Sequence, residues 1–196
     1  MWPGFQNENG IIISSFGIMM FIAFLSCNLL IKKTLKEKNI NPKIGDDIIF
    51  WAAIGGIIGA KLYYYIEFGF STEGVDGVWS AIQNFGSGLV FYGGLLGGLF
   101  AVSLYIYIKK MSWLEYADIV APLLALGHSI GRIGCFLVHD CDGIESKYDF
   151  FPLAVQFPDS GKYLYPTQIY EMLAYFAIFL YLYSYRHRVN FKGELF

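Results

Sequence analysis

GHSIGRIGCFLVHDCDG, residues Gly127–Gly143, is the stretch that decides how this chain folds and what it does. It follows the apolar run Ile119–Leu126, yet it contains two histidines, an arginine, two cysteines and two aspartates. Four of its polar residues fall on one face at helical spacing: His128, Arg132, Cys135 and His139. A guanidinium inside a membrane is expensive and normally has a counter-charge and a function. The stretch therefore predicts a functional polar face on an otherwise apolar helix.

The composition predicts a helical membrane protein. Of the 196 residues, 56% are hydrophobic and 15% are charged, whereas soluble domains average about 25% charged residues. Several apolar runs approach the roughly 20 residues that a helix needs to cross a bilayer. We therefore expect an all-α, polytopic membrane protein in which residues 1–196 form a single integral membrane domain. The net charge of −2 and the lack of a basic patch give no indication of nucleic-acid binding.

About five apolar segments have the length of membrane spans: residues 11–31, 48–66 and 89–108, a segment that begins near residue 118, and residues 167–185. The stretches before, between and after them hold none, five, none, two, two and three basic residues. Because loops rich in lysine and arginine stay in the cytoplasm, this alternation predicts an outside N-terminus and a cytoplasmic C-terminus. Gly127–Gly143 then lies at the outer end of the fourth span, and we expect the chemistry at the outer leaflet.

Glycines recur at the spacing that lets membrane helices approach closely. The sets are Gly55 and Gly59; Gly93, Gly94, Gly97 and Gly98; and Gly127 and Gly131. We interpret most of them as helix-packing positions. Tyr92-Gly93-Gly94 is the exception, because Gly86 and Gly88 just before it indicate a helix break. A broken helix end in a membrane is tolerated mainly where it lines a cavity.

The cysteines and histidines match no recognised metal pattern. Cys27, Cys135 and Cys141 form neither a metal motif nor a disulfide framework. One alternative set of ligands stays open, although its spacing matches no zinc pattern: His128, His139, Asp140 and Cys141. We expect no bound metal.

Four blocks, in order and across nearly the whole chain, resemble the prolipoprotein diacylglyceryl transferase family. GAKLYYYIEF, residues 59–68, is similar to the family's Gly-x-Arg-x-x-Tyr block, and FYGGLLGG, residues 91–98, is similar to its His-Gly-Gly-x-x-Gly block. GRIGCFLVHDCDG, residues 131–143, resembles the signature Gly-Arg-x-Gly-Asn-Phe-x-Asn-x-Glu-x-x-Gly. YPTQIYE, residues 165–171, resembles His-Pro-Ser/Thr-Gln-Leu-Tyr-Glu. One block alone is weak, whereas the ordered set with a matching topology is specific.

Several positions depart from the family pattern. Tyr92 stands where the family usually has a histidine, and Phe16 stands near a usual tyrosine. Cys135 replaces the signature asparagine, His139 a usual glycine, and Asp140 the signature glutamate. The matching signature positions are Gly131, Arg132, Gly134 and Gly143. The chain ends at KGELF, where the family continues into two further helices, so the resemblance implies a divergent member that is truncated at its C-terminus.

The resemblance implies an enzyme of lipoprotein maturation in the bacterial inner membrane. Its substrates would be phosphatidylglycerol and the lipobox cysteine in a prolipoprotein signal peptide, with membrane lipids around it and no cofactor. Arg132, Asp140 and Tyr92 lie in the matching blocks and are candidate catalytic residues, and His128, one turn before Arg132, is a fourth. The substrate-binding residues that it implies are Arg132, Gly93, Gly94, Gly131, Gly134, Cys135, Gly143, Gln168 and Glu171.

Arg132 suits the binding of the lipid phosphate, because its planar fork binds phosphate bidentately. The alternative is a structural ion pair with one of three acids: Asp140, Asp142 or Glu171. Gln168 and Glu171 share a helix face, and we expect them to be the partners that support Arg132. The hydroxyl of Tyr92 is a candidate contact for the lipid headgroup.

Other roles and functions stay open at this stage. Asp140 either orients Arg132, takes the thiol proton or caps the helix end, and His128 is either a base, a second phosphate contact or a hydrogen-bonded interior residue. We expect His139, the outermost of the four, to be solvated. A small transporter or channel, with Arg132, His128 and Asp140 as a relay, is one alternative function. A catalytically inactive family member is the other.

Overall fold

The computed structural model describes residues 4–7, 10–69, 90–141, 143–157 and 161–196. The chain divides into two compact units, one made of residues 1–34 with 114–196 and one made of residues 35–113. Each unit has its own helix packing. The single membrane domain expected over residues 1–196 stays a prediction.

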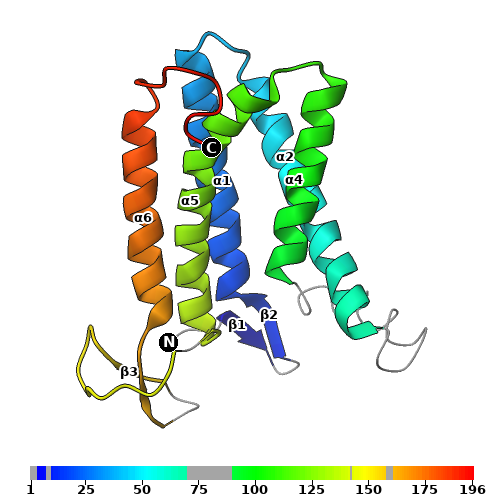
Figure 1. Cartoon of the computed structure of the whole chain (residues 1–196). Coiled ribbons are helices and arrows are strands. Elements are labelled where there is room, and N and C mark those ends of the chain that lie inside the picture. Colours follow the sequence, from blue (N-terminus) through cyan, green and yellow to red (C-terminus); the bar gives the residue numbers. More distant parts are fainter. Residues whose placement is uncertain (1–3, 8–9, 70–89, 142, 158–160) are drawn as a thin grey trace. The chain divides into compact units, whose positions relative to one another are not determined.

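Three helices lie side by side in the first unit (Figure 1): α1 (Ser15–Glu37), α5 (Trp113–Val138) and α6 (Thr167–Tyr185). Two short antiparallel hairpins accompany them: β1–β2 (Gly4–Asn7 and Gly10–Ser14) before α1, and β3–β4 (Val155–Gln156 and Tyr163–Leu164) before α6. Ala125, Leu126 and Phe179 form a buried cluster between α5 and α6, and Leu30 of α1 packs against it. The three helices therefore share one apolar core.

The second unit holds a helix pair and a turn of π-helix: α2 (Lys43–Tyr64), η1 (Tyr65–Gly69) and α4 (Phe91–Ile108). The two long helices pack through glycine. A Cβ on Gly59 would lie 2.7 Å from the Cα of Gly97, and a Cβ on Gly93 would lie 2.5 Å from the carbonyl oxygen of Gly59. No side chain fits at such separations, so the helix-packing role predicted for Gly59 and Gly97 is confirmed.

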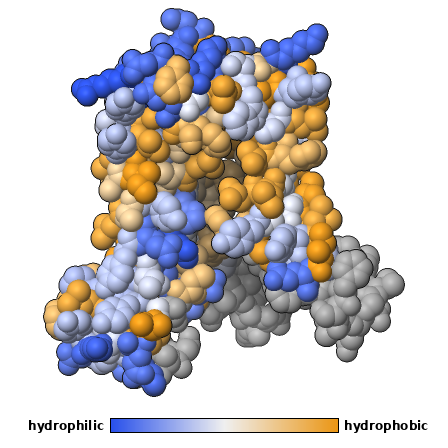
Figure 2. Space-filling view, viewed as in Figure 1, coloured by the Kyte–Doolittle hydropathy of each residue, from blue (hydrophilic) through white to orange (hydrophobic). Residues whose placement is uncertain are grey.

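Among the described residues, four helical segments are long and apolar enough to cross a membrane: Ser15–Glu37, Lys43–Glu67, Phe91–Ile108 and Trp113–Val138. α6 forms over the predicted residues 167–185 but is not one of the four, because its tyrosines and Glu171 lower its hydropathy. On the face in Figure 2, apolar side chains cover the middle of the helices and hydrophilic ones gather toward the ends. The predicted helical membrane protein is confirmed, whereas five spans and the orientation of the termini stay predictions.

Three helices start elsewhere than the hydropathy predicts. α1 starts at Ser15 rather than at residue 11, because the preceding isoleucines belong to strand β2 and β-branched residues favour strands. α2 starts at Lys43 rather than at residue 48, and α5 starts at Trp113 rather than near Asp118. In both cases residues that lie outside the continuous apolar run extend the helix, with charged residues among them, since helix propagation needs a hydrogen bond per residue and not an apolar side chain.

Lys110, in the turn that follows the end of α4 at Ile108, has the left-handed conformation that favours glycine. The φ of Lys110 is 55°, and the Met111 N–H donates to the carbonyl of Ile106 at 3.0 Å, which is a Schellman-type helix end. A side chain costs roughly 1–2 kcal/mol in this conformation, while glycine adds unfolded-state entropy of about 0.4–1 kcal/mol. Lys110→Gly is therefore expected to stabilise the chain by about 0.5–1 kcal/mol, measured by unfolding the purified protein in mixed micelles.

Lys109 is the matched control for this substitution. Its φ is −78°, an ordinary helical value, so Lys109→Gly is expected to destabilise the chain by about 0.5–1 kcal/mol. Shifts of the same sign at the two neighbouring lysines would contradict the left-handed helix end.

Candidate functional site

An ion pair between α5 and α6 holds Arg132. Its Nη2 lies 2.6 Å from Oε2 of Glu171, and the two side chains are 23% and 39% exposed. The guanidinium also interacts with the thiols of Cys135 and Cys141. Its buried Nε has no hydrogen-bond partner among the described residues. The expected pairing of Arg132 with Glu171 is thus present, and it leaves part of the fork available for an anion.

The same side of α5 makes two further contacts with α6. The His128 ring lies against the ring of Tyr175, with 4.1 Å between their centroids. The buried Ser129 hydroxyl donates to the carbonyl of Met172 at 2.9 Å. These contacts fix α6 beside Arg132. His128 is half-buried, which agrees with the alternative that it is an interior residue. Its role as a base or phosphate contact stays a prediction.

α5 ends at Val138, so the predicted helical face does not continue to His139. The φ of His139 is 59°, and the Asp140 N–H donates to the carbonyl of Cys135 at 3.0 Å, which closes a Schellman-type helix end. Glycine, the usual residue of the similar signature at this position, adopts such a φ without steric cost. The prediction that His139 is solvated is wrong. The residue is half-buried, and its ring lies edge-on to the ring of Phe157 with 5.6 Å between centroids.

The turn after α5 is tied to the start of α6. Oδ1 of Asp140 accepts the Cys141 N–H at 2.9 Å, and the Asp140 carbonyl accepts Nε2–H of Gln168 at 2.8 Å. The Thr167 hydroxyl donates to the carbonyl of Cys141 at 3.2 Å. A Cβ on Gly143 would lie 2.9 Å from Cγ2 of Thr167, so a side chain does not fit there. Asp140 thus supports the turn, and its catalytic role stays a prediction.

Gly131 and Gly134 face α1. A Cβ on Gly134 would lie 3.0 Å from the ring of Phe16, which makes this glycine a close packing position. A Cβ on Gly131 would lie 3.9 Å from the sulfur of Met20, an ordinary contact distance. Helix packing therefore accounts for Gly134 but not for Gly131, and substrate binding by either glycine stays a prediction.

Tyr92, Gly93 and Gly94 belong to the second unit, in the first turn of α4. Tyr92 is 67% exposed, while Gly93 is buried against α2. The helix break expected before them concerns Gly86 and Gly88, which lie outside the described residues. Close packing accounts for Gly93, and the catalytic role of Tyr92 and the binding roles of both glycines stay predictions.

Sequence reasoning missed the role of Asp118, a buried carboxylate in α5. Its Oδ2 accepts the Gly193 N–H at 2.6 Å, and its Oδ1 accepts the N–H groups of Leu195 and Phe196 at 2.9 and 3.2 Å. The signal in the sequence is an acid directly before the apolar run 119–126, because a buried carboxylate there needs donors from elsewhere. Asp118 therefore anchors the C-terminal residues to α5.

Glu194 organises the same C-terminal residues from within. Its carboxylate accepts the N–H groups of Asn190 and Phe191 at 2.5 and 3.4 Å and the Tyr185 hydroxyl at 3.2 Å. The hydrogen bond from the Asn190 N–H, followed by the others, lowers the pKa of Glu194, because these donors stabilise the charged form. The residues after α6 are thus folded against Asp118 and around Glu194.

The chain is similar to known proteins along most of its length. A family model described as prolipoprotein diacylglyceryl transferase matches residues 5–196. Phosphatidylglycerol–prolipoprotein diacylglyceryl transferase from Clostridium tetani is 32% identical over 194 residues, which cover 95% of this chain and 75% of that protein. Phosphatidylglycerol–prolipoprotein diacylglyceryl transferase 2 from Clostridium perfringens is 33% identical, over 94% of this chain and 72% of that protein. The corresponding Leptospira interrogans protein is 29% identical over 91% of this chain and 64% of its own length. The chain belongs to the prolipoprotein diacylglyceryl transferase family.

Proposed function

We propose that this chain transfers a diacylglyceryl group from phosphatidylglycerol to the lipobox cysteine thiol of a prolipoprotein, at the outer leaflet of the bacterial inner membrane. The observation that carries the proposal is the Arg132–Glu171 pair at 2.6 Å, with the buried Nε of Arg132 lacking a hydrogen-bond partner among the described residues. The names of the relatives supply the lipid donor and the protein acceptor.

The reaction needs an ionised thiol, a held phosphate and little water. The peptide thiol, with a pKa of about 8.5, loses its proton. Its sulfur then bonds to a glyceryl carbon of the lipid, and the bond from that carbon to the phosphate oxygen breaks. Negative charge develops on the departing glycerol phosphate, where the fork of Arg132 binds and stabilises it. Glu171 keeps the guanidinium oriented between α5 and α6.

The remaining site residues have subordinate roles in this proposal. Asp140 and His128 are the candidate acceptors of the thiol proton, since a general base must lie within hydrogen-bond reach of the proton it removes. Tyr92 is an exposed residue, and its hydroxyl is the candidate contact for the lipid headgroup. Gln168 acts through the turn after α5, because its amide holds the Asp140 carbonyl.

The test is a transfer assay with the purified chain in vesicles. A lipobox peptide is added to vesicles of phosphatidylglycerol, and mass spectrometry follows the gain of one diacylglyceryl group on the peptide cysteine. We expect transfer from phosphatidylglycerol and none in vesicles of phosphatidylcholine alone. A peptide that stays unmodified while a relative modifies it in the same vesicles would refute the proposal, and ion flux without peptide would favour a transporter.

A further inference from the structure

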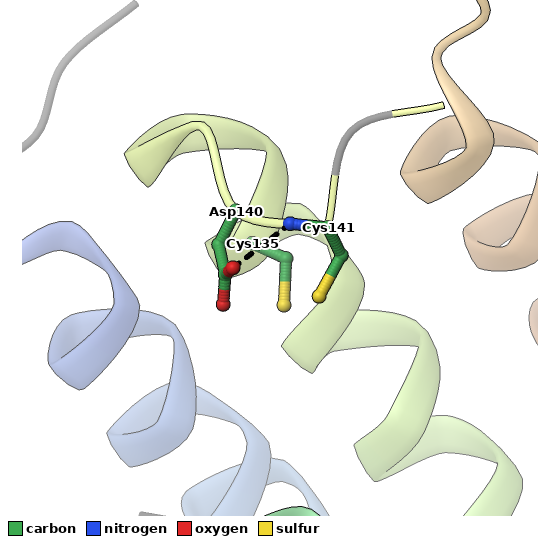
Figure 3. Close-up of side chains that lie close together, drawn as sticks. All are labelled: Cys135, Asp140 and Cys141. Carbon is green, nitrogen blue, oxygen red and sulfur yellow. Dashed lines mark hydrogen bonds between the residues drawn. The ribbon is translucent and has the colours of Figure 1, made fainter. Parts of the chain in front are cut away.

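Three side chains with metal-binding atoms meet at the end of α5 (Figure 3). Cys135 comes from the last turn of the helix, and Asp140 and Cys141 come from the turn that follows. Their thiol sulfurs and a carboxylate oxygen all lie within 4.8 Å of one another. Among the described residues, these are the three histidine, cysteine or acidic side chains that the fold brings close enough to hold one metal ion. The set considered from the sequence is not assembled, since His128 packs on Tyr175 and His139 on Phe157.

The backbone holds these three side chains in place before any ligand arrives. The Asp140 N–H donates to the Cys135 carbonyl at 3.0 Å, so the chain turns back over the last turn of α5. Oδ1 of Asp140 accepts the Cys141 N–H at 2.9 Å, and the carbonyls of both residues accept hydrogen bonds from α6. Cys141 has a φ of 62°, which directs its side chain back toward Cys135 (Figure 3). Because this backbone is already ordered, it loses little conformational entropy when a ligand binds.

We propose that Cys135, Asp140 and Cys141 form a binding site for a soft or borderline divalent cation of the zinc and cadmium class. Two sulfur ligands and one carboxylate oxygen suit such an ion, and a water molecule completes its tetrahedron. A tetrahedral zinc ion with metal–sulfur distances of about 2.3 Å holds its sulfur ligands about 3.8 Å apart. The two sulfur atoms therefore need to approach each other by no more than about 1 Å, and the exposed Cys141 and Asp140 side chains can move toward the ion by rotation.

The charges around the site are compatible with this ion. Binding releases both thiol protons, so the two thiolate charges offset the charge of the divalent cation and the net charge of the cluster does not change. Arg132 interacts with both thiols and is itself paired with Glu171, so its positive charge already has a partner. Asp140 and Cys141 are exposed, which leaves an entry path for the ion.

The first test measures binding of Cd²⁺ alone to the reduced full chain in detergent micelles. We expect one ion per chain and the near-ultraviolet absorption of cadmium–thiolate bonds. Cys135→Ser and Cys141→Ser are each expected to weaken binding on the order of 100-fold, and Asp140→Asn on the order of tenfold. Cys27→Ser is the matched control, because Cys27 is buried in α1 and its thiol donates to the Leu123 carbonyl at 3.4 Å.

The second test needs no substitution and so does not depend on the folding of variants. Cd²⁺ is expected to slow alkylation of Cys135 and Cys141, read residue by residue by mass spectrometry, and to leave Cys27 unchanged. Three results would overturn the proposal: no cadmium–thiolate absorption, unchanged affinity in both serine variants, or alkylation of Cys141 at the same rate with and without the ion. A chain lighter by two hydrogens, with Cys135 and Cys141 resistant to alkylation before metal is added, would replace it by a disulfide.

Discussion

Lysine in place of Arg132 is expected to lower the rate of diacylglyceryl transfer about 30- to 1,000-fold, equivalent to roughly 2–4 kcal/mol of transition-state stabilisation. A guanidinium presents a rigid fork to phosphate, whereas an ammonium is a point charge that cannot reproduce two parallel hydrogen bonds. The pair with Glu171 at 2.6 Å orients that fork, and a lysine in α5 keeps the charge but loses the geometry. The effect therefore isolates geometry from net charge.

The measurement is the initial rate of the vesicle assay at saturating phosphatidylglycerol. Arg188→Lys, in an exposed residue after α6, is the matched control and is expected to leave the rate unchanged. Glu171→Gln is expected to have a smaller effect than Arg132→Lys, because it removes the orienting charge and keeps the fork. An Arg132→Lys rate within a factor of two of the parent would exclude phosphate binding by this residue.

Alanine in place of Asp118 is expected to destabilise the chain by about 2–4 kcal/mol, because it removes a charged acceptor of three hydrogen bonds. Asp118 is 7% exposed, and its carboxylate accepts the backbone N–H groups of Gly193, Leu195 and Phe196. The loss is smaller than the sum of three charged hydrogen bonds, since the released C-terminal residues can bond to water. Asp118→Asn is expected to lie in between, because one amide oxygen remains as an acceptor.

Two readouts separate this local effect from general unfolding. Limited proteolysis after residue 185 should become faster in Asp118→Ala, and unfolding in mixed micelles should shift to lower denaturant. Glu145→Ala is the matched control, because Glu145 and Lys162 form an exposed pair at 2.8 Å, and such pairs contribute about 0–1 kcal/mol. Equal stability of the Asp118 and Glu145 variants would show that the anchor is not needed.

The sequence was informative wherever one physical effect dominated. Apolar runs located the five long helices of the described residues, because a backbone in the bilayer core must satisfy its own hydrogen bonds and an α-helix does so within one segment. Glycine spacing found the α2–α4 contact, since at Gly59 and Gly97 a side chain would overlap the facing backbone. Glu171 was one of three acids considered as the ion-pair partner of Arg132, because a charge in an apolar setting normally has a counter-charge.

The periodicity of apolar residues could predict neither the local backbone geometry nor hydrogen-bond partners that are distant in the sequence. His139 fits the helical pattern by its spacing, but its φ is positive and the helix has already ended. The spacing of apolar residues does not indicate a positive φ. The proximity of Cys135 to Cys141 depends on that turn. Asp118 takes its donors from residues more than seventy positions away in the sequence, so the acid before the apolar run indicates that donors are needed but not which residues supply them.

The glycine contact between α2 and α4 also determines how that pair responds to temperature. Lipid tails are as apolar as leucine, so association of two helices in a bilayer gains nothing from removing water. Gly59, Gly93 and Gly97 have no rotamers to lose, and the side-chain entropy cost of bringing them together is close to zero. What remains is dispersion between closely fitted backbones. Such a contact keeps its strength on cooling, whereas apolar packing in water weakens.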